Sequence, residues 1–575
     1  MNKMSEFLCK KELLLIGTVG NVDTNTIIIN VSDEEKIKKV QVNQLIAVQS
    51  SKVGQYLISM VSKIISRPLD LPNTEDDEGA ENIFSSNIIK AVLIGTFFKK
   101  NGVKSNVFKR SLSVVPSILA DCYLLQGDDL KIFMSSIAGK SENRDELRLG
   151  TYSIDNDTVA FLNGDKFFQR HAVIVGSTGS GKSWCVAKIL EQVAKLNSAN
   201  AILFDIHGEY STLNNDGFSQ WKIAGPNDSP DDENIIFLPY WFLTYEEMLS
   251  MILDRSDNNA PNQAMLFSKE VLIQKKKFLD DINEQKLQEE ITVDSPVPYN
   301  FAQLLAELND KDTEMVDSSS RKKQGPFHGK LTRFIQRLEA KKNDKRLNFM
   351  FNNNVGRLDY LNKLCKALMV PALDSKNGVK IIDFSEVPSD ILPLISSLIA
   401  RIIFSVQQWM NLESRTPIAI FCDEAHLYIS SENDELNTMA RDSFKRISKE
   451  GRKYGIGLVI ITQRPSEVDK TVLSQCNNFI AMRLTNNEDQ NVIKRLLPDS
   501  LGNYTELLPI LDVGEAIVVG DSCLLPSKIR VSEPTLKPLS ATFDFWDEWC
   551  KEGEKNDIDN AVSALRIQTK IKKIN

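Results

Sequence analysis

Short apolar runs separated by polar segments characterise the first 140 residues of the chain. Their length suits strands better than helices, which indicates a β-rich region. Gly20-Asn21 and Lys100-Asn101-Gly102 supply turn signals between them, and the acidic stretch 73–79 is typical of a solvated loop. The apolar runs occupy 13–16, 26–31, 45–48 and 88–98. This pattern predicts a small β-barrel.

From residue 171 onward, strand-like apolar runs alternate with stretches that suit helices. This alternation predicts an α/β fold with a mostly parallel sheet, because a parallel connection needs a crossover segment. In such sheets, ligands bind beyond the carboxyl ends of the strands. The expected strands lie at 172–175, 201–204, 235–237, 379–384, 418–421, 457–461, 479–484 and 516–519. We therefore expect functional side chains directly after several of these runs.

A charged segment with helical patterning and few strand signals interrupts the α/β region. Within it, 321–346 carries ten lysines and arginines, which fits either a DNA-facing surface or a solvated helical face. The predicted organisation is a barrel for assembly or partner docking at 1–140, a first part of the core at 141–244, a helical insertion at 245–370, a second part of the core at 371–535 and a C-terminal tail at 536–575.

The composition is that of an ordinary globular protein. The 575 residues are 42% hydrophobic and 25% charged, with a formal net charge of −8. This charge argues weakly against a nucleic-acid coat, although local basic surfaces can still bind phosphate. The eight cysteines form no C-x-x-C pair, so they indicate neither a zinc site nor a disulfide framework. We identify no signal peptide and no run of about 18 apolar residues, and expect a cytoplasmic protein without a membrane partner.

The first chemical motif follows the strand expected at 172–175. It fits G-x-x-x-x-G-K-[ST] at every fixed position and consists of Gly176, Ser177, Thr178, Gly179, Ser180, Gly181, Lys182 and Ser183. Glycines let backbone N–H groups wrap a phosphate, and the N-terminus of the following helix adds a positive dipole end. Lys182 can reach the β- and γ-phosphates, and Ser183 can ligate Mg²⁺. The motif predicts binding of a nucleoside triphosphate.

Two further expected strands end in polar side chains suited to nucleotide hydrolysis. After 418–421, Asp423 can hold Mg²⁺ directly or through water, and Glu424 can polarise the attacking water. After 457–461, Gln463 is suited to sense the γ-phosphate or orient water, with a structural amide as the alternative. The letters D-E-A-H suggest a DEAH-box helicase, but the other motifs of that class are not apparent, so we reject this assignment.

Two other polar motifs lie near these strands. Asp205 and Glu209 could support Mg²⁺ or couple the site to DNA, and structural capping is the alternative. His207 has no evident set of partner ligands for a metal. The basic turn at 449–455 could present Arg452 to the phosphates of a neighbouring subunit, with a solvated turn as the alternative.

Taken together, six segments resemble the HerA family of P-loop ATPases. They follow the family's order over 171–520 and read HAVIVGSTGSGKS, FDIHGEY, IFCDEAHLYI, EGRKYGIGLVIITQRPSEVD, TVLSQCNNFIAMRL and GEAIVVGD. The resemblance implies a RecA-like P-loop core, a homo-hexameric ring, ATP hydrolysis with Mg²⁺ and translocation of double-stranded DNA through the pore. It also implies an N-terminal β-barrel, which the first 140 residues match in pattern and not in motif.

The resemblance also assigns roles to individual residues. The assigned residues are Lys182 and Ser183 for phosphate and Mg²⁺, Asp423 and Glu424 as the Walker B pair, Gln463 as the sensor and Arg452 as an arginine-finger candidate. Arg170, just before the first core strand, also matches a basic residue of the family. If Arg452 is not the finger, Arg446 and Arg170 are the next candidates.

Family members usually work with a nuclease, and some bacterial ones are paired with a sirtuin-like or nuclease effector in phage defence. This chain has no evident nuclease or NAD-cleaving site, so we expect a separate effector. Two functional classes stay open. One is a motor that feeds DNA to a nuclease, in phage defence or DNA-end processing. The other is an ATPase scaffold that gates its effector with little translocation, and a conjugation-type ATPase is a more distant third.

Overall fold

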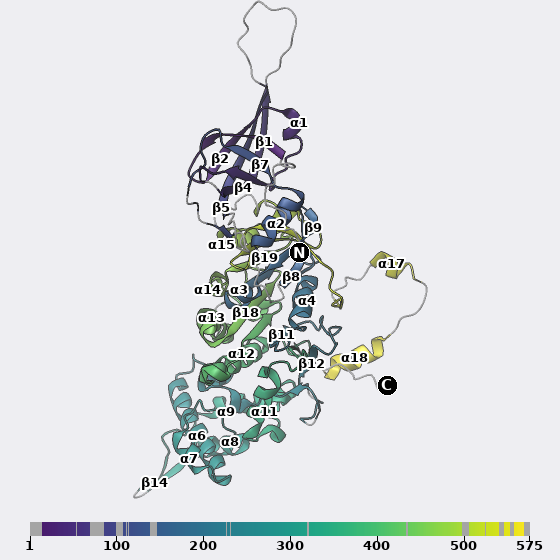
Figure 1. Cartoon of the computed structure of the whole chain (residues 1–575). Coiled ribbons are helices and arrows are strands. Elements are labelled where there is room, and N and C mark those ends of the chain that lie inside the picture. The colour runs from purple at the N-terminus through teal and green to yellow at the C-terminus, as the bar shows by residue number, and fades with distance from the viewer. Residues whose placement is uncertain are drawn as a thin grey trace, which may run out of the picture. The chain divides into compact units, whose positions relative to one another are not determined.

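A computed structural model of the chain shows two compact units (Figure 1). Unit 1 comprises Met1–Ile189 and Asn477–Glu533, and unit 2 comprises Leu190–Cys476 and Pro534–Asn575. The structure describes residues 14–52, 54–68, 85–98, 107–110, 112, 114–137, 147–153, 155–225, 227–230, 232–318, 321–432, 435–496, 505–523, 525–539, 545–551 and 557–567. The acidic stretch 73–79 and the turn signal at 100–102 lie outside the described residues.

The N-terminal part of unit 1 is a closed antiparallel barrel. Its strands are β1 (Leu14–Val22), β2 (Thr26–Val31), β3 (Leu45–Gln49), β4 (Gln55–Pro68), β5 (Ser85–Phe98), β6 (Val107–Lys109) and β7 (Asp121–Leu124). They hydrogen-bond in the order β2-β1-β7-β3-β4-β5-β6, and the pairing of β2 with β5 closes the first six into a barrel. Helices α1 (Glu34–Ile37) and α2 (Gly127–Ile137) follow β2 and β7. The predicted small β-barrel is confirmed.

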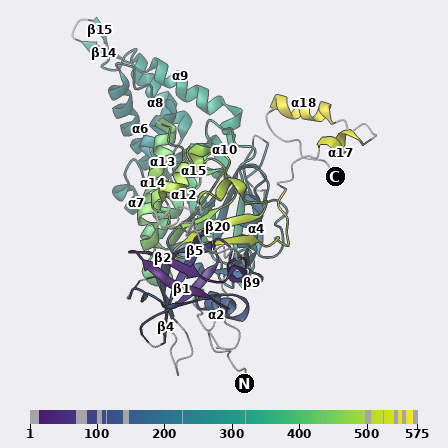
Figure 2. The same ribbon diagram turned by 90° about the horizontal axis from the view of Figure 1, so that it is seen from above.

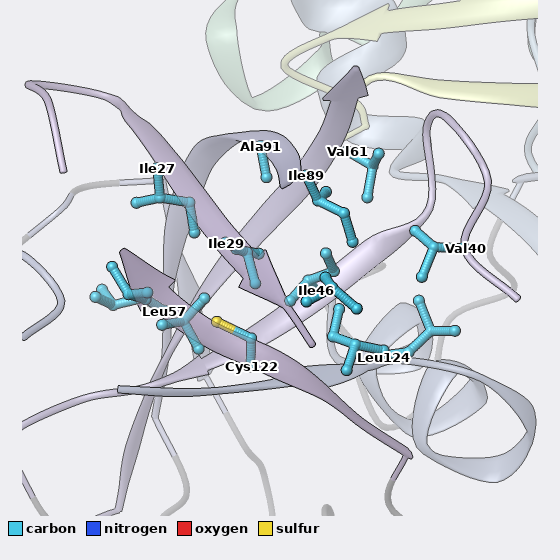
Figure 3. Packing of buried hydrophobic residues seen from close by; sticks show 14 of the residues in the cluster. Ile27, Ile29, Val40, Ile46, Leu57, Val61, Ile89, Ala91, Cys122 and Leu124 are labelled. Atoms are coloured by element: carbon cyan, nitrogen blue, oxygen red, sulfur yellow. The ribbon is translucent and has the colours of Figure 1, made fainter. Parts of the chain in front are cut away.

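Alternating apolar side chains fill the barrel (Figure 3). Ile27 and Ile29 of β2 are both fully buried, because every second side chain of a strand points to the same face. Ile46, Leu57 and Ile89 from β3, β4 and β5 belong to the same cluster. These buried apolar side chains form the core of the barrel and account for the apolar runs in the first 140 residues.

The turn expected at Gly20-Asn21 is wrong. Gly20 lies inside β1, where the register with β2 shifts between Val19 and Asn21, as at a β-bulge. A Cβ on Gly20 would lie 2.3 Å from Nδ2 of Asn30. The glycine therefore allows a close approach between two strands, and residues 23–25 make the connection to β2.

The remainder of unit 1 contributes six further strands in the order β10-β19-β20-β21-β8-β9. Their bounds are β8 (Leu147–Tyr152), β9 (Asp155–Leu162), β10 (Ala172–Val175), β19 (Asn478–Ala481), β20 (Glu515–Gly520) and β21 (Ser527–Val531). β10 and β19 pair in parallel, and the four following pairs are antiparallel. The helices are α3 (Gly164–Gln169), α15 (Asn487–Leu496) and α4 (Lys182–Val193), which continues into unit 2. The sequence pattern predicted β10, β19 and β20 and missed the other three strands.

Unit 2 contributes six strands in the order β13-β12-β16-β11-β17-β18, all paired in parallel. Their bounds are β11 (Ala201–Asp205), β12 (Phe218–Ile223), β13 (Ile235–Ile236), β16 (Val379–Asp383), β17 (Ile418–Cys422) and β18 (Ile456–Thr462). Every residue of β11, β17 and β18 is buried, as in a parallel sheet covered on both faces. The helices outside the 245–370 segment are α12 (Leu392–Trp409), α13 (Glu435–Glu450), α14 (Lys470–Ser474), α17 (Phe545–Trp549) and α18 (Ile558–Ile567).

The segment 245–370 is mainly helical, as predicted. Its elements are α5 (Tyr245–Ile252), α6 (Ala260–Asp281), α7 (Gln285–Glu290), α8 (Phe301–Thr313), the hairpin β14 (Met315–Ser318) and β15 (Arg321–Gln324), α9 (Thr332–Asn343), α10 (Asn348–Phe351) and α11 (Asp359–Met369). Figure 2 shows α6, α8 and α9 grouped beside this hairpin. Within the basic stretch, Arg337 pairs with Asp254 and Arg346 with Asp344, both at 2.7 Å. Part of the positive charge is therefore neutralised inside unit 2.

Helix α12 is long and apolar enough to cross a membrane by length and composition, a feature that we did not identify in the sequence. Its 18-residue window has a mean hydropathy of 1.2, and 67% of the window is buried. Arg401 in the middle of α12 donates two hydrogen bonds, of 2.7 and 2.8 Å, to the carboxylate of Glu247 on α5. These contacts are those of a core helix of unit 2, tied by an ion pair to the helical segment.

Candidate functional site

The phosphate-loop motif joins a buried strand to a helix within unit 1. All four residues of β10 are buried, and α4 begins at Lys182. The N–H group of Cys185 donates to the carbonyl of Gly181 at 3.0 Å, which fixes the loop onto the first turn of the helix. The first turn of a helix directs N–H groups without intrahelical acceptors toward its N-terminal side, where they bind phosphate.

The glycines of the motif satisfy steric requirements of this loop. Gly179 and Gly181 have φ angles of +74° and +101°, which side chains disfavour. A Cβ on Gly176 would lie 2.4 Å from Oγ of Ser180 and 2.9 Å from Cβ of Met482. The loop therefore folds back on itself so tightly that Gly176 admits no side chain without rearrangement.

Two segments distant in sequence hold the loop in place. Ser177 donates twice to the carbonyl of Arg483, from its backbone N–H at 2.8 Å and from its hydroxyl at 2.9 Å. The N–H group of Gly514 donates to the carbonyl of Ser180 at 3.0 Å. Sequence reasoning missed the supporting roles of Arg483 and Gly514, because both act through backbone groups and leave no motif of their own.

Two polar groups of the loop, on Lys182 and Ser180, find no matching partner among the residues that the structure describes. Lys182 is buried, and no carboxylate among the described residues pairs with its ammonium group. The hydroxyl of Ser180 is fully buried without a hydrogen-bond partner. A buried charge without a counter-ion is unfavourable, and a bound anion removes that cost. These residues fit a triphosphate, and the Mg²⁺-ligand role of Ser183, directly after Lys182, stays a prediction from the sequence.

The second group of predicted residues lies at the carboxyl ends of neighbouring strands in unit 2. Asp423 and Glu424 directly follow β17 and are both buried. Glu424 adopts the left-handed conformation, with φ 42° and ψ 47°, which is strained for a residue with a side chain. The Tyr428 hydroxyl donates to the carbonyl of Asp423 at 2.9 Å, and this hydrogen bond stabilises the turn. Strain of this kind persists only where surrounding contacts enforce it, and it is typical of functional sites.

The structure brings the end of β18 to the same place. Because β17 and β18 are adjacent parallel strands, Thr462 and Gln463 lie at the same sheet edge as Glu424. His426 connects the two strand ends: its Nδ1 lies 3.1 Å from Oγ1 of Thr462 and 3.3 Å from Oε2 of Glu424. The sequence predicted Gln463 and Glu424 but gave no role to His426 or Thr462.

The acidic motif after β11 has a structural function. Asp205 is buried and accepts hydrogen bonds from the N–H groups of Glu209 and Tyr210, at 3.0 and 2.9 Å. Burial, with a smaller contribution from the neighbouring Asp383, raises the pKa of Asp205 to about 6 against the opposing effect of the backbone N–H donors. These contacts match the capping alternative for Asp205, while His207 is exposed.

Arg452 lies apart from the other candidates of unit 2. It is exposed in the short 3-10 helix Gly451–Tyr454, immediately before β18, whereas Gln463 follows the opposite end of that strand. Seven strand residues separate the two ends, which corresponds to about 23 Å at about 3.3 Å per residue. Arg452 therefore does not converge on Glu424 of its own unit. Of the other candidates, Arg170 pairs with Asp521 at 3.4 Å, and Arg446 stacks on Phe404 at 4.6 Å.

Comparison with known proteins finds similarity to one family of helicases. Residues 147–403, which include the complete phosphate loop, match the family model described as "Helicase HerA, central domain". A probable helicase of Methanocaldococcus jannaschii is 24% identical over 555 residues, covering 90% of this chain and 96% of that protein. The "DNA double-strand break repair helicase HerA" of Sulfurisphaera tokodaii is 26% identical over 407 residues, covering 69% of this chain and 71% of that protein. The chain therefore resembles the HerA family in sequence.

Solved structures similar to this chain include a conjugative coupling protein and VirB4. The "bacterial conjugative coupling protein TrwB" has 13% sequence identity and a TM-score of 0.43, over 72% of this chain and 94% of that one. VirB4 of Thermoanaerobacter pseudethanolicus has 16% identity and a TM-score of 0.44, over 68% of this chain and 97% of that one. The sequence likenesses to HerA helicases, together with the complete phosphate loop, are those of a P-loop ATPase of the helicase type.

Proposed function

We propose that this chain is a member of the HerA family and a motor that uses ATP hydrolysis to translocate along or unwind double-stranded DNA. The observation that carries the proposal is the phosphate loop with its buried Lys182, which pairs with no carboxylate among the described residues, in a chain that resembles HerA helicases. Curated relatives from several archaea are described as DNA double-strand break repair helicases, which supports DNA as the substrate. The proposal extends to a homo-hexameric ring in the cytoplasm.

The proposal gives each residue of the nucleotide motifs a chemical role. Lys182 holds the β- and γ-phosphates of ATP, while Ser183 and Asp423 hold Mg²⁺, which neutralises charge on the phosphates when bound. Glu424 orients and polarises the attacking water, and Gln463 responds to the γ-phosphate. Water attacks the terminal phosphorus, and the P–O bond to ADP breaks. The proton of the water passes toward the Glu424 carboxylate or to phosphate.

The N-terminal barrel supports a second element of the proposal, a separate effector protein. The barrel contains none of the nucleotide motifs, and a ring would present six copies of it as docking surfaces. A nuclease would make the protein a machine for DNA-end processing or phage defence. A sirtuin-like NAD-cleaving enzyme would favour the alternative, an ATPase scaffold that gates its effector.

Steady-state ATP turnover with and without linear double-stranded DNA tests the proposal. A motor should hydrolyse ATP faster on DNA, because translocation couples each turnover to the track. Lys182→Ala, measured in parallel, reports hydrolysis by contaminating enzymes. ATP turnover that is unchanged by DNA but changes when the effector is added would contradict the motor hypothesis and support the scaffold hypothesis.

A further inference from the structure

His426 occupies the space between the hydrolytic carboxylate and the sensor strand. It lies in the 3-10 helix Ala425–Leu427, directly after Glu424, and its side chain is buried. One ring nitrogen, Nδ1, is within 3.3 Å of Oε2 of Glu424 and within 3.1 Å of Oγ1 of Thr462. A single polar atom thus faces both the residue that polarises water and the end of β18.

Thr462 links this contact to the segment that carries Gln463. It is the last residue of β18 and is fully buried. Its hydroxyl oxygen accepts a hydrogen bond of 3.0 Å from the N–H group of Arg464. This hydrogen bond joins the residues on either side of Gln463. A movement of residues 462–464 must therefore displace the Thr462 hydroxyl relative to His426.

The carboxylate of Glu424 needs a partner at this position. Its Oε2 is fully buried and has no hydrogen bond of good geometry in the structure. An unsatisfied buried carboxylate oxygen is costly, so a nearby donor stabilises whichever orientation brings the oxygen to it. Nδ1 of His426, 3.3 Å from Oε2, is a group that can donate to it.

We propose that His426 is a positioning residue that couples the orientation of Glu424 to the position of residues 462–464. The proposal rests on the role of Glu424 in hydrolysis that is part of the proposed function. His426 does not touch the nucleotide or the attacking water in this proposal. It acts through the carboxylate that does.

Two hydrogen-bond arrangements are available to the three side chains without any change in net charge. In the first, the Thr462 hydroxyl donates to Nδ1, the imidazole carries its proton on Nε2, and Glu424 is free to turn toward water. In the second, Nδ1 carries the proton and donates to Oε2, which holds the carboxylate against His426. Displacement of Thr462 removes its donor from Nδ1 and favours the second arrangement. A shift of the sensor segment thereby restrains Glu424.

Substitutions at His426 separate this role from simple packing. The amide of His426→Asn places a polar atom near the position of Nδ1, whereas the amide of His426→Gln reaches toward Nε2. We expect His426→Asn to keep a kcat near the wild-type value. His426→Gln should lower kcat by up to about 10²-fold with an unchanged KM for ATP, because a misplaced group slows the chemical step without weakening nucleotide binding.

Substitutions at Thr462 provide a matched second pair. Thr462→Ser keeps the hydroxyl and should keep kcat, whereas Thr462→Val keeps the shape, loses the hydroxyl and should lower kcat at constant KM. If both residues act through the same chain of hydrogen bonds to Glu424, the kcat of the double variant His426→Gln, Thr462→Val should be no lower than that of the slower single variant. Thermal unfolding and ATP affinity of the same preparations verify that each variant is folded, and the Thr462 pair decides alone if His426→Gln does not fold.

The results that would contradict the positioning role of His426 differ from those that would contradict the proposed function as a DNA motor. Equal loss in His426→Asn and His426→Gln, multiplied losses in the double variant, or losses confined to KM would each show that His426 only packs. The His426 and Thr462 variants are all compared by their ATP turnover without DNA. In the separate test with DNA, a wild-type protein whose ATP turnover does not change would contradict the proposed function but not the role of His426.

Discussion

At the scale of single residues, the nucleotide chemistry depends on side chains that are buried without sufficient partners. Lys182 lacks a carboxylate partner among the described residues, and the Oε2 atom of Glu424 lacks a hydrogen bond. Each arrangement is unfavourable in the isolated chain and becomes favourable when phosphate, metal or water arrives. The two residues should therefore fail in different ways when they are substituted.

We expect Lys182→Ala to lose both ATP affinity and turnover, because a positive charge beside the β- and γ-phosphates disappears. Glu424→Gln should bind ATP and hydrolyse it extremely slowly, because the amide polarises water poorly. Equilibrium binding of a fluorescent ATP analogue and steady-state turnover distinguish the two defects. Near wild-type turnover of Glu424→Gln would show that the water is polarised by another residue.

Asp205 makes a pH-dependent contribution to stability. Burial raises its pKa to about 6 in the folded state, above the ordinary value of 3.8. The folded state therefore binds this proton more tightly, so the contribution is fully present below about pH 4 and is lost as the pH rises through about 6. The shift corresponds to about 3 kcal/mol. Asp205→Asn carries no titratable proton and should lack this decline.

Denaturant unfolding of both proteins at about pH 4 and about pH 7 measures this effect. The comparison uses the change with pH within each protein, so the hydrogen bond that the asparagine loses cancels. An equal loss of stability with pH in both proteins would assign the titration to another group.

At the scale of elements, the sequence predicted the strands and loops that the local pattern of apolar and polar residues determines. The fully buried strands β10, β11, β17 and β18 and the phosphate loop were readable, because burial on both faces leaves nearly continuous apolar runs. The strand β12 was missed, since four of its six residues are only half-buried and half of its sequence FSQWKI is polar. Strands β8, β9 and β21 mix polar and apolar residues in the same way.

Contacts between elements were less predictable than the elements themselves. His426 and Thr462 are 36 positions apart and meet only because β17 and β18 are neighbours in the sheet. Arg452 was expected near the γ-phosphate of a neighbouring subunit, and the parallel order of β18 places it at the opposite strand end from Gln463. Strand direction was implicit in the pattern, but strand adjacency was not.

The phosphate loop as an element should be intolerant of a side chain at Gly176. Gly176→Ala places a methyl group 2.4 Å from Oγ of Ser180, so the loop must open and ATP affinity should fall. Overpacking of this kind costs about 1–3 kcal/mol, which corresponds to about 5- to 150-fold weaker ATP binding if the whole cost falls on the bound state. Gly164→Ala is the matched control, because a Cβ there meets nothing within 4 Å. Unchanged ATP affinity in Gly176→Ala would show that the loop adapts without cost.

At the scale of the whole molecule, the position of Arg452 bears on assembly. An exposed arginine about one strand length from Gln463 of its own chain can serve an active site only from a neighbouring copy. Arginine fingers supplied in trans accelerate hydrolysis by about 10³–10⁵-fold. Arg452→Ala should therefore nearly abolish turnover and spare ATP binding.

Mixing two inactive proteins tests the trans assignment. Rings of Arg452→Ala and rings of Glu424→Gln should each be inactive, whereas mixed rings contain interfaces with both residues intact and should regain partial turnover. Mass spectrometry must first demonstrate mixed rings, and several subunit ratios guard against ring-wide coordination that masks rescue. No recovery at any ratio in proven mixed rings would exclude Arg452 and point to Arg446 or Arg170.

The claim that ATP hydrolysis at this site drives movement on double-stranded DNA is tested most directly by triplex displacement. A labelled third strand is annealed to one end of a linear duplex, and its release is followed with wild-type protein, with Glu424→Gln and without ATP. We predict release that requires ATP and is absent with Glu424→Gln, although that variant still binds ATP and DNA. Release that is equally fast with Glu424→Gln, or no release by wild-type protein that binds DNA and hydrolyses ATP, would contradict the account.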